Sequence, residues 1–127
     1  MTVMDGAFLP IEGTFDIALA RRAVRVRMAA HRWTPTTHAR VSAALTALGE
    51  LILLPCVIKA VVVKFDILDV PAAGIELSCT IFQNGGNDEQ MSQAQDRLKR
   101  ATDELNITPT SNGLQIAARV WVNGVRA

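Results

Sequence analysis

Residues 40–53 constrain the fold most, because their apolar side chains recur at spacings of three and four residues. Such spacing predicts a helix with one broad apolar face. Thr34 is placed to cap this helix, Pro35 suits its first position, and Pro55 ends it. Strand-like segments follow, so we expect the helix to lie across a sheet in the centre of the core. Its apolar residues are Val41, Ala44, Leu45, Leu48, Leu51 and Ile52.

Alternation of apolar and polar residues predicts strands over residues 57–67, 75–81 and 114–122. Residues 7–13 are expected to form an edge strand, because Pro10 has no amide hydrogen to donate to a neighbouring strand. A short strand around Ile107 precedes a hairpin turn at Asn112 and Gly113. A turn at residues 69–74 makes the strands on either side of it antiparallel neighbours.

An earlier helix is expected to begin at Thr14 or Asp16 and to end near Arg32. One narrow sector of its helical wheel is apolar, and we expect this stripe to face the core. The stripe comprises Phe15, Leu19, Ala23, Val26, Ala30 and Trp33. The far side carries Arg21, Arg25 and Arg32, flanked by Arg22. These arginines form either a solvated surface or a docking surface for an acidic partner, since arginine binds carboxylates through two hydrogen bonds.

Asn87 and Gln90 resemble a capping box, which predicts a third helix. Its apolar stripe comprises Met91, Ala94, Leu98, Ala101 and Leu105. The complete order is then β-α-α-β-β-α-β-β. This order favours an α/β fold of the α+β kind, a two-layer sandwich with a largely antiparallel mixed sheet and helices packed on one face.

The length of 127 residues is sufficient for a single domain, residues 1–127, whose core needs no metal or disulfide. A formal net charge of +1 gives no field that attracts nucleic acid or an anionic membrane surface. The first residues lack a signal-peptide pattern, and the longest apolar stretch, residues 51–63, is too short to span a bilayer. We therefore expect a cytoplasmic location, where Cys56 and Cys79 are free, buried thiols.

Four segments, taken in order, resemble the GHKL (histidine-kinase-like, Bergerat) ATPase family, and most of all its small bacterial anti-sigma factors that act as serine kinases. Residues 17–25 are similar to the opening helix of that branch, with its Ala-Arg and Val-Arg pattern. Residues 40–48 lie where the family carries its N-box helix. Residues 96–107 resemble the last helix and the strand entry after it, and residues 114–121 the closing strand, which often ends in a basic residue and Trp. The resemblance implies the Bergerat fold over nearly the whole chain.

The nucleotide-binding motifs of that family are missing here. The N box has a Glu that activates the nucleophile and, four residues later, an Asn that holds Mg²⁺; the aligned residues are Ala47 and Leu51. Neither side chain can accept a proton or ligate a hard cation. The family's adenine-reading Asp has no counterpart before the Gly85 and Gly86 pair, and residues 86–96 leave no room for a lid and a glycine-rich phosphate loop.

We therefore expect a non-catalytic regulatory protein of the anti-sigma-factor type, without a cofactor, that binds another protein through Arg21, Arg25 and Arg32. By resemblance, the partner would be a sigma factor, a STAS-type antagonist or a signalling phosphatase, and self-association as a homodimer is a further expectation. One alternative is an active ATP- and Mg²⁺-dependent serine kinase with Glu50 as its base. Its nucleotide would be held by Asn84, Gly85 and Gly86. A second alternative is a small-molecule sensor whose vacated nucleotide pocket is closed by Leu48 and Leu51.

Other combinations of polar residues carry less chemistry. His31 and His38 have no thiol or carboxylate at the spacing of a zinc site, and neither cysteine has a histidine placed to activate it. Asp103 and Glu104 are expected late on a helix, as part of a solvated face rather than as an acid–base pair. Asn84 and the two glycines after it could bind an anion through backbone amides, although a plain turn is the simpler interpretation.

Overall fold

A computed structural model describes residues 3–69, 72–84 and 88–122 of the chain. Along these residues the elements are β1 (Val3–Ile11), α1 (Thr14–Met28), the 3-10 turn η1 (Ala29–His31), α2 (Pro35–Ile52), β2 (Val61–Leu68), β3 (Gly74–Phe82), α3 (Asp88–Ala101), β4 (Glu104–Pro109) and β5 (Gly113–Trp121). The predicted order of strands and helices is confirmed. Asn87, Gly85 and Gly86 lie outside the described residues.

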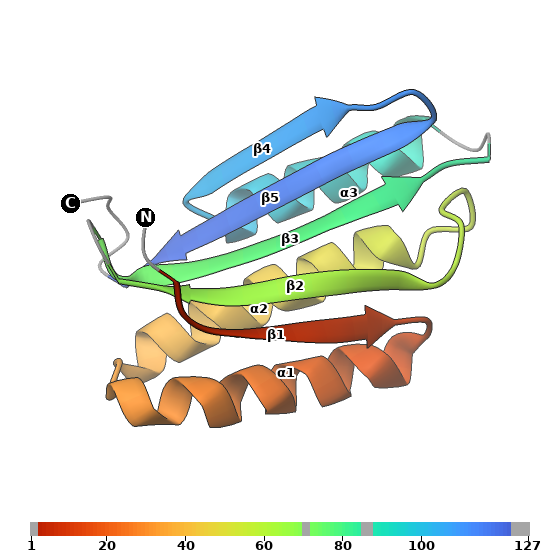
Figure 1. Cartoon of the computed structure of the whole chain (residues 1–127). Helices are drawn as coiled ribbons and strands as arrows, with labels where there is room; N and C mark the ends of the chain where they lie inside the picture. The colour runs from red at the N-terminus through yellow and green to blue at the C-terminus, as the bar shows by residue number, and fades with distance from the viewer. Residues whose placement is uncertain (1–2, 70–71, 85–87, 123–127) are drawn as a thin grey trace.

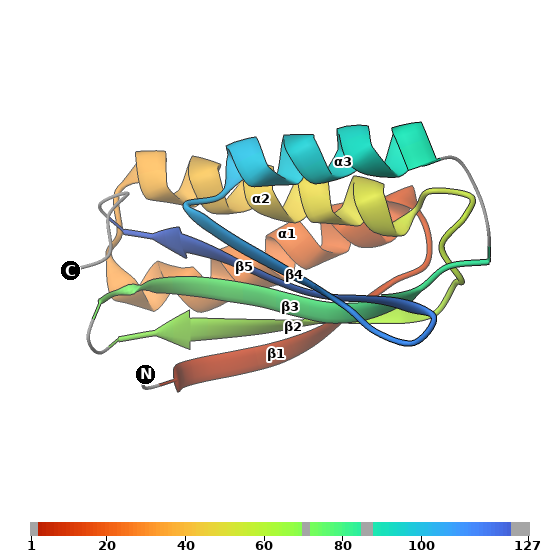
Figure 2. The ribbon, with the colours of Figure 1, turned by 90° about the horizontal axis from the view of Figure 1, so that it is seen from above.

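The five strands form one sheet in the order β1-β2-β3-β5-β4 (Figure 1). Every neighbouring pair in the described sheet is antiparallel, so the expectation of a mixed sheet is wrong. The helices α1, α2 and α3 cover one face of the sheet, and the other face is open (Figure 2). The predicted two-layer α+β arrangement is therefore confirmed, and β1 is an edge strand, as its proline indicated.

The helix α2 is the centre of the core, between α1 and α3 (Figure 1). It begins as predicted: Pro35 occupies its first turn, and the Thr34 hydroxyl accepts a hydrogen bond from the N–H of Thr37 at 3.2 Å. All six of its predicted apolar residues are buried. The strands contribute alternate residues to the same core, including Val63, Phe65, Ile75, Leu77, Ile116 and Val120. Burial of these alternating side chains fixes the register of the sheet.

Two helix predictions are wrong in part. The helix α3 ends at Ala101, and Leu105 lies in β4 instead of continuing the helical stripe. The helix α1 has the opposite orientation to the one predicted: Ile17, Ala20, Val24 and Met28 are buried, whereas Phe15 and Val26 are 73% and 69% exposed.

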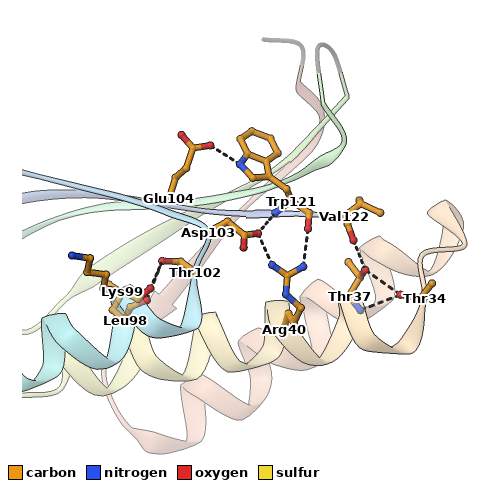
Figure 3. A network of polar contacts seen from close by, with 10 residues as sticks. All are labelled: Thr34, Thr37, Arg40, Leu98, Lys99, Thr102, Asp103, Glu104, Trp121 and Val122. Carbon is orange, nitrogen blue, oxygen red and sulfur yellow. Dashed lines mark hydrogen bonds and ion pairs between the residues drawn. The ribbon is translucent and has the colours of Figure 1, made fainter. Parts of the chain in front are cut away.

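A polar clasp fastens the first turns of α2 to the end of β5 (Figure 3). The Arg40 guanidinium donates to the carbonyl oxygen of Trp121 at 2.8 Å and to the carboxylate of Asp103. That carboxylate also accepts the N–H of Trp121 at 2.7 Å, while the Thr37 hydroxyl donates to the carbonyl of Val122 at 3.0 Å. The clasp joins segments that are far apart in the sequence, so it stabilises the packing of α2 against the end of β5.

The residues Asp103 and Glu104 are therefore structural and do not form the solvated helical pair that was expected. Asp103 belongs to the clasp, and Glu104, the first residue of β4, accepts a hydrogen bond from the indole N–H of Trp121. The Trp121 ring is 1% exposed and packs with Leu68 and Ala72 in a small cluster separate from the main core. Gly74 makes room for this ring, because a Cβ there would lie 2.7 Å from a ring carbon.

Candidate protein-binding face

The positions aligned with the family's nucleotide site are apolar and mostly closed. Leu51 and Leu48 have no exposed surface, so no water-sized space touches their side chains. Ala47 is half-buried against the same core. Glu50, the alternative catalytic base, is exposed on the last turn of α2. A hard cation requires oxygen ligands, and neither Ala47 nor Leu51 offers one.

The described part of the predicted nucleotide loop is held in place by backbone hydrogen bonds. The N–H of Asn84 donates to the carbonyl of Cys56 at 3.0 Å, and the N–H of Ile58 donates to the carbonyl of Phe82 at 2.8 Å. Residues just after α2 are thereby held against the end of β3. The structure brings Asn84 close to the segment that follows Glu50; Gly85 and Gly86, the other two residues of the predicted nucleotide loop, are outside the described residues.

Nucleophilic and metal chemistry gain no support from the titratable side chains. Within the described residues, no group of three or more His, Cys, Asp and Glu side chains is placed to hold a metal ion. His31 lies against the Trp33 ring, with centroids 5.4 Å apart. Both cysteines are buried and free, and burial raises the pKa of the Cys79 thiol to about 12. At neutral pH that thiol is protonated, which makes it a poor nucleophile.

The main unexplained surface is the outward face of α1. Here the predicted core stripe is exposed instead: Phe15, Leu19 and Val26 are 73%, 47% and 69% exposed, and Ala23 between them is half-buried. The helix therefore has two apolar faces, and only the opposite one packs on the sheet and α2. Large apolar side chains that gather on one exposed helix face indicate a site for another protein. We call Phe15, Leu19, Ala23 and Val26 the outer stripe.

Arginines surround the outer stripe. Arg22 and Arg25 are exposed, and neither guanidinium has a partner within the described residues. Arg25 lies on the side of α1 that faces α2, whereas Arg22 borders the outer stripe. Arg21 reaches α2 and donates to the Thr46 hydroxyl at 3.3 Å. On the other side, Arg27 pairs with Asp5 of β1 at 2.8 Å. Of the predicted binding residues, Arg21 and Arg25 therefore share a helix side, with Ser42 and His38 of α2 near them, whereas Arg32 follows η1 with a left-handed φ of 55°.

An open groove runs between α1 and the edge strand β1, which lie side by side (Figure 1). The groove, of about 250 Å³, is lined by Phe8, Leu9, Pro10, Asp16, Leu19, Ala20 and Ala23. A second, shallow depression of about 600 Å³ lies on α1 itself and is lined by Leu19, Arg22, Ala23, Val26 and Arg27. Leu19 and Ala23 line both, so the outer stripe is continuous with the groove. The lining of the groove is mainly apolar, and Arg22 and Arg27 border the depression on α1.

The open face of the sheet has the character of a solvated surface. A shallow concavity of about 630 Å³ there is lined by hydroxyl, amide and charged side chains of β2 to β5 together with apolar ones, among them Phe8 of β1 and Val62 of β2, which are 72% and 48% exposed. Charged residues on this face pair with each other: Arg119 with Glu76 at 2.7 Å, and Lys64 with Asp66 at 3.6 Å. One polar, solvated face is the usual condition of an antiparallel sheet with helices on its other side. The outer stripe is the stronger candidate for a binding site.

No protein-family model matches the sequence, and no curated protein matches it. In the described part of the chain, no helix is long and apolar enough to cross a membrane.

Sequence reasoning identified the apolar residues of the outer stripe but assigned them to the core. It also missed Arg27 and Asp5, which meet only because α1 folds back beside β1, and the partnership of Arg40 with Asp103. A signal for the first error was available: Ile17, Ala20, Val24 and Met28 form a second apolar sector on the opposite side of the same helix. A helix with two apolar sectors can bury either one.

Proposed function

We propose that this protein is a non-catalytic regulator of the anti-sigma-factor type that acts by binding another protein. The observation that carries the proposal is the outer stripe of α1, which exposes two large side chains by about 70% of their surface. Holding Phe15 and Val26 in water costs hydrophobic free energy that a partner would recover. No covering segment of this chain packs on Phe15 within the described residues.

The proposal includes the loss of nucleotide chemistry. At the positions aligned with the N box, Leu51 is fully buried and Ala47 has only a methyl group. Restoring a site there would require replacing part of the core that α2 forms with the sheet. By resemblance, the scaffold would be a degenerate GHKL domain and the partner a sigma factor, a STAS-type antagonist or a signalling phosphatase. Arg21, Arg25 and Arg32 remain the proposed partner-binding arginines.

The first test is a titration of the pure protein with ATP and ADP, with and without Mg²⁺, followed by thermal unfolding. A ligand at about 100 times its Kd stabilises a fold by nearly 3 kcal/mol, which raises Tm by several degrees in a domain of this size. The proposal predicts no Mg²⁺-dependent shift at millimolar nucleotide. A clear shift that disappears in Glu50→Gln would contradict it and support the serine-kinase alternative.

The alternative function, a small-molecule sensor that uses the vacated nucleotide pocket, has no supporting observation. Leu48 and Leu51, which would close that pocket, are already packed in the core without exposed surface.

A further inference from the structure

We infer that the outer stripe of α1, with the groove beside it, binds an amphipathic helix of the partner that has apolar residues on one face and acidic residues beside them. The inference rests on the proposed function, because it specifies the chemistry of the partner that the outer stripe binds. Three observations carry it: the apolar floor, the unpaired arginines and the protected edge of β1.

The apolar floor has the spacing of a helix–helix contact. Phe15, Leu19 and Val26 follow one another at intervals of four and seven residues. Seven large apolar side chains are exposed in the described chain, and four of them, Phe8, Phe15, Leu19 and Val26, belong to β1 and α1. A helix with apolar residues at similar spacing can place its side chains between them, as helices in grooves commonly do.

The charge around the stripe selects the partner. Residues 14–32 contain five arginines and one aspartate, although the whole chain has a net charge of only +1. Arg22 and Arg25 have no side-chain partner within the described residues, so both guanidinium groups can donate hydrogen bonds to carboxylates of a partner. The acidic Asp16 is already occupied, because its carboxylate accepts the N–H groups of Glu12 and Gly13 at 2.8 Å and 3.2 Å. Arg22 borders the outer stripe and Arg25 lies on the α2 side of the same helix, so the exposed surface of α1 favours an acidic partner.

The same charges disfavour a second copy of this chain in the groove. In an antiparallel pair of α1 helices that aligned the two stripes, the twofold axis would pass near the midpoint between Phe15 and Val26. Arg22 lies close to that midpoint, so the axis would bring it near Arg22 of the second copy. Like charges opposite each other in an interface oppose association.

The edge of β1 is protected against the addition of a strand. In an antiparallel pair every second residue directs its N–H away from the partner strand. One such alternate set in β1 is Gly6, Phe8 and Pro10. Two of these three residues cannot donate a backbone hydrogen bond to an added strand. The N–H of Gly6 already donates to the Asp5 carboxylate at 2.8 Å, and Pro10 has no N–H. Charged residues and proline at an edge are known protection against strand pairing. A helix in the groove needs none of these donors.

The inference is tested by selecting peptides on the full-length chain from a displayed library of helical peptides, randomised on one face and its flanks. We expect enriched peptides to have apolar residues at i, i+3 or i+4, and i+7, with Asp or Glu beside them. The affinity of a synthetic peptide of this type should fall at least tenfold on Val26→Asp and on the double variant Arg22→Glu, Arg25→Glu. The charge-matched control Arg97→Glu, Arg100→Glu on α3 should bind it as the unmodified chain does.

Four results would overturn the inference. These are the absence of any enriched amphipathic acidic peptide, enrichment of strand-like alternating peptides, equal binding to the stripe variants, and equal loss on the α3 control. A fifth would be a stable dimer of the unmodified chain in sedimentation equilibrium that Val26→Asp dissociates, since a second copy would then occupy the groove. Failure of the proposed function appears separately, as Mg²⁺-dependent stabilisation by ATP in a chain whose groove still binds the acidic peptide.

Discussion

Arg40 shows how a single side chain connects three elements. Its guanidinium contacts the carboxylate of Asp103, before β4, and the last carbonyl of β5. Replacement by alanine leaves the Asp103 carboxylate with one N–H donor and the Trp121 carbonyl without its side-chain donor. We expect Arg40→Ala to lower the free energy of unfolding by about 1–3 kcal/mol. Urea denaturation measures the change.

The matched control for that variant is Arg100→Ala, which removes an exposed arginine from the end of α3. Its effect should stay within about 0.5 kcal/mol, as for most exposed positions. Equal losses in the two variants would mean that the clasp adds nothing beyond the loss of one positive charge.

The buried thiol of Cys79 should make the stability of the fold depend on pH in the alkaline range. Burial raises its pKa from 9.0 to about 12, so between these values the unfolded chain releases a proton that the folded chain retains. The unfolded state binds fewer protons there, and stability therefore falls as pH rises above about 9, by up to about 1.4 kcal/mol per pH unit from this group. Unfolding curves of Cys79→Val should show a smaller loss between pH 9 and 11. An unchanged slope would contradict the assignment to Cys79.

The two faces of α1 offer a direct comparison between buried and exposed valines. Val24 is 3% exposed and Val26 is 69% exposed, and both lie in the same helix. We expect Val24→Ala to cost about 2 kcal/mol through lost burial and a cavity. Val26→Ala should be neutral or should stabilise the chain by a few tenths of a kcal/mol, because alanine is the better helix former. Thermal or urea unfolding of both variants measures these changes. A large loss of stability in Val26→Ala would mean that the outer stripe is not exposed in solution.

The elements themselves were largely predictable from the sequence. The helix α2 has a capping threonine, a proline in its first turn and one apolar sector, so local signals and tertiary packing agree. Alternation in β2, β3 and β5 gave the correct buried residues for the same reason. The boundary between α3 and β4 was missed because Leu105 continues the helical spacing, and only pairing of β4 with β5 reveals that it belongs to a strand.

The candidate site was less predictable, because it depends on which of two apolar sectors of α1 is buried. Both sectors contain large and small apolar side chains: Phe15, Leu19, Ala23 and Val26 in the outer one, and Ile17, Ala20, Val24 and Met28 in the inner one. Hydrophobicity alone therefore does not decide between the two faces. Packing against α2 distinguishes them: a Cβ at Gly49 would lie 2.7 Å from Ile17, so the Ile17 side chain occupies the space that the absence of a side chain at Gly49 leaves.

At the level of the whole molecule, the exposed chemistry is unevenly distributed. The edge formed by β1 and α1 has the outer stripe, the groove and the unpaired arginines. The open sheet face pairs its charges internally, through Arg119 with Glu76 and Lys64 with Asp66. Under the proposed function, binding through this edge would leave the open sheet face to solvent.

The strand order has a consequence for biosynthesis. β5 lies between β3 and β4, yet it is made after every other described strand. While the chain emerges from the ribosome, β1, β2 and β3 can pair in turn, but β4 has no neighbour until β5 is inserted beside it. The hydrogen-bonding edge of β3 stays unpaired through that interval. Arg40 also lacks its hydrogen bond to the carbonyl of Trp121 until β5 is in place. The nascent chain is therefore most exposed to aggregation or to a chaperone just before its final described strand is complete.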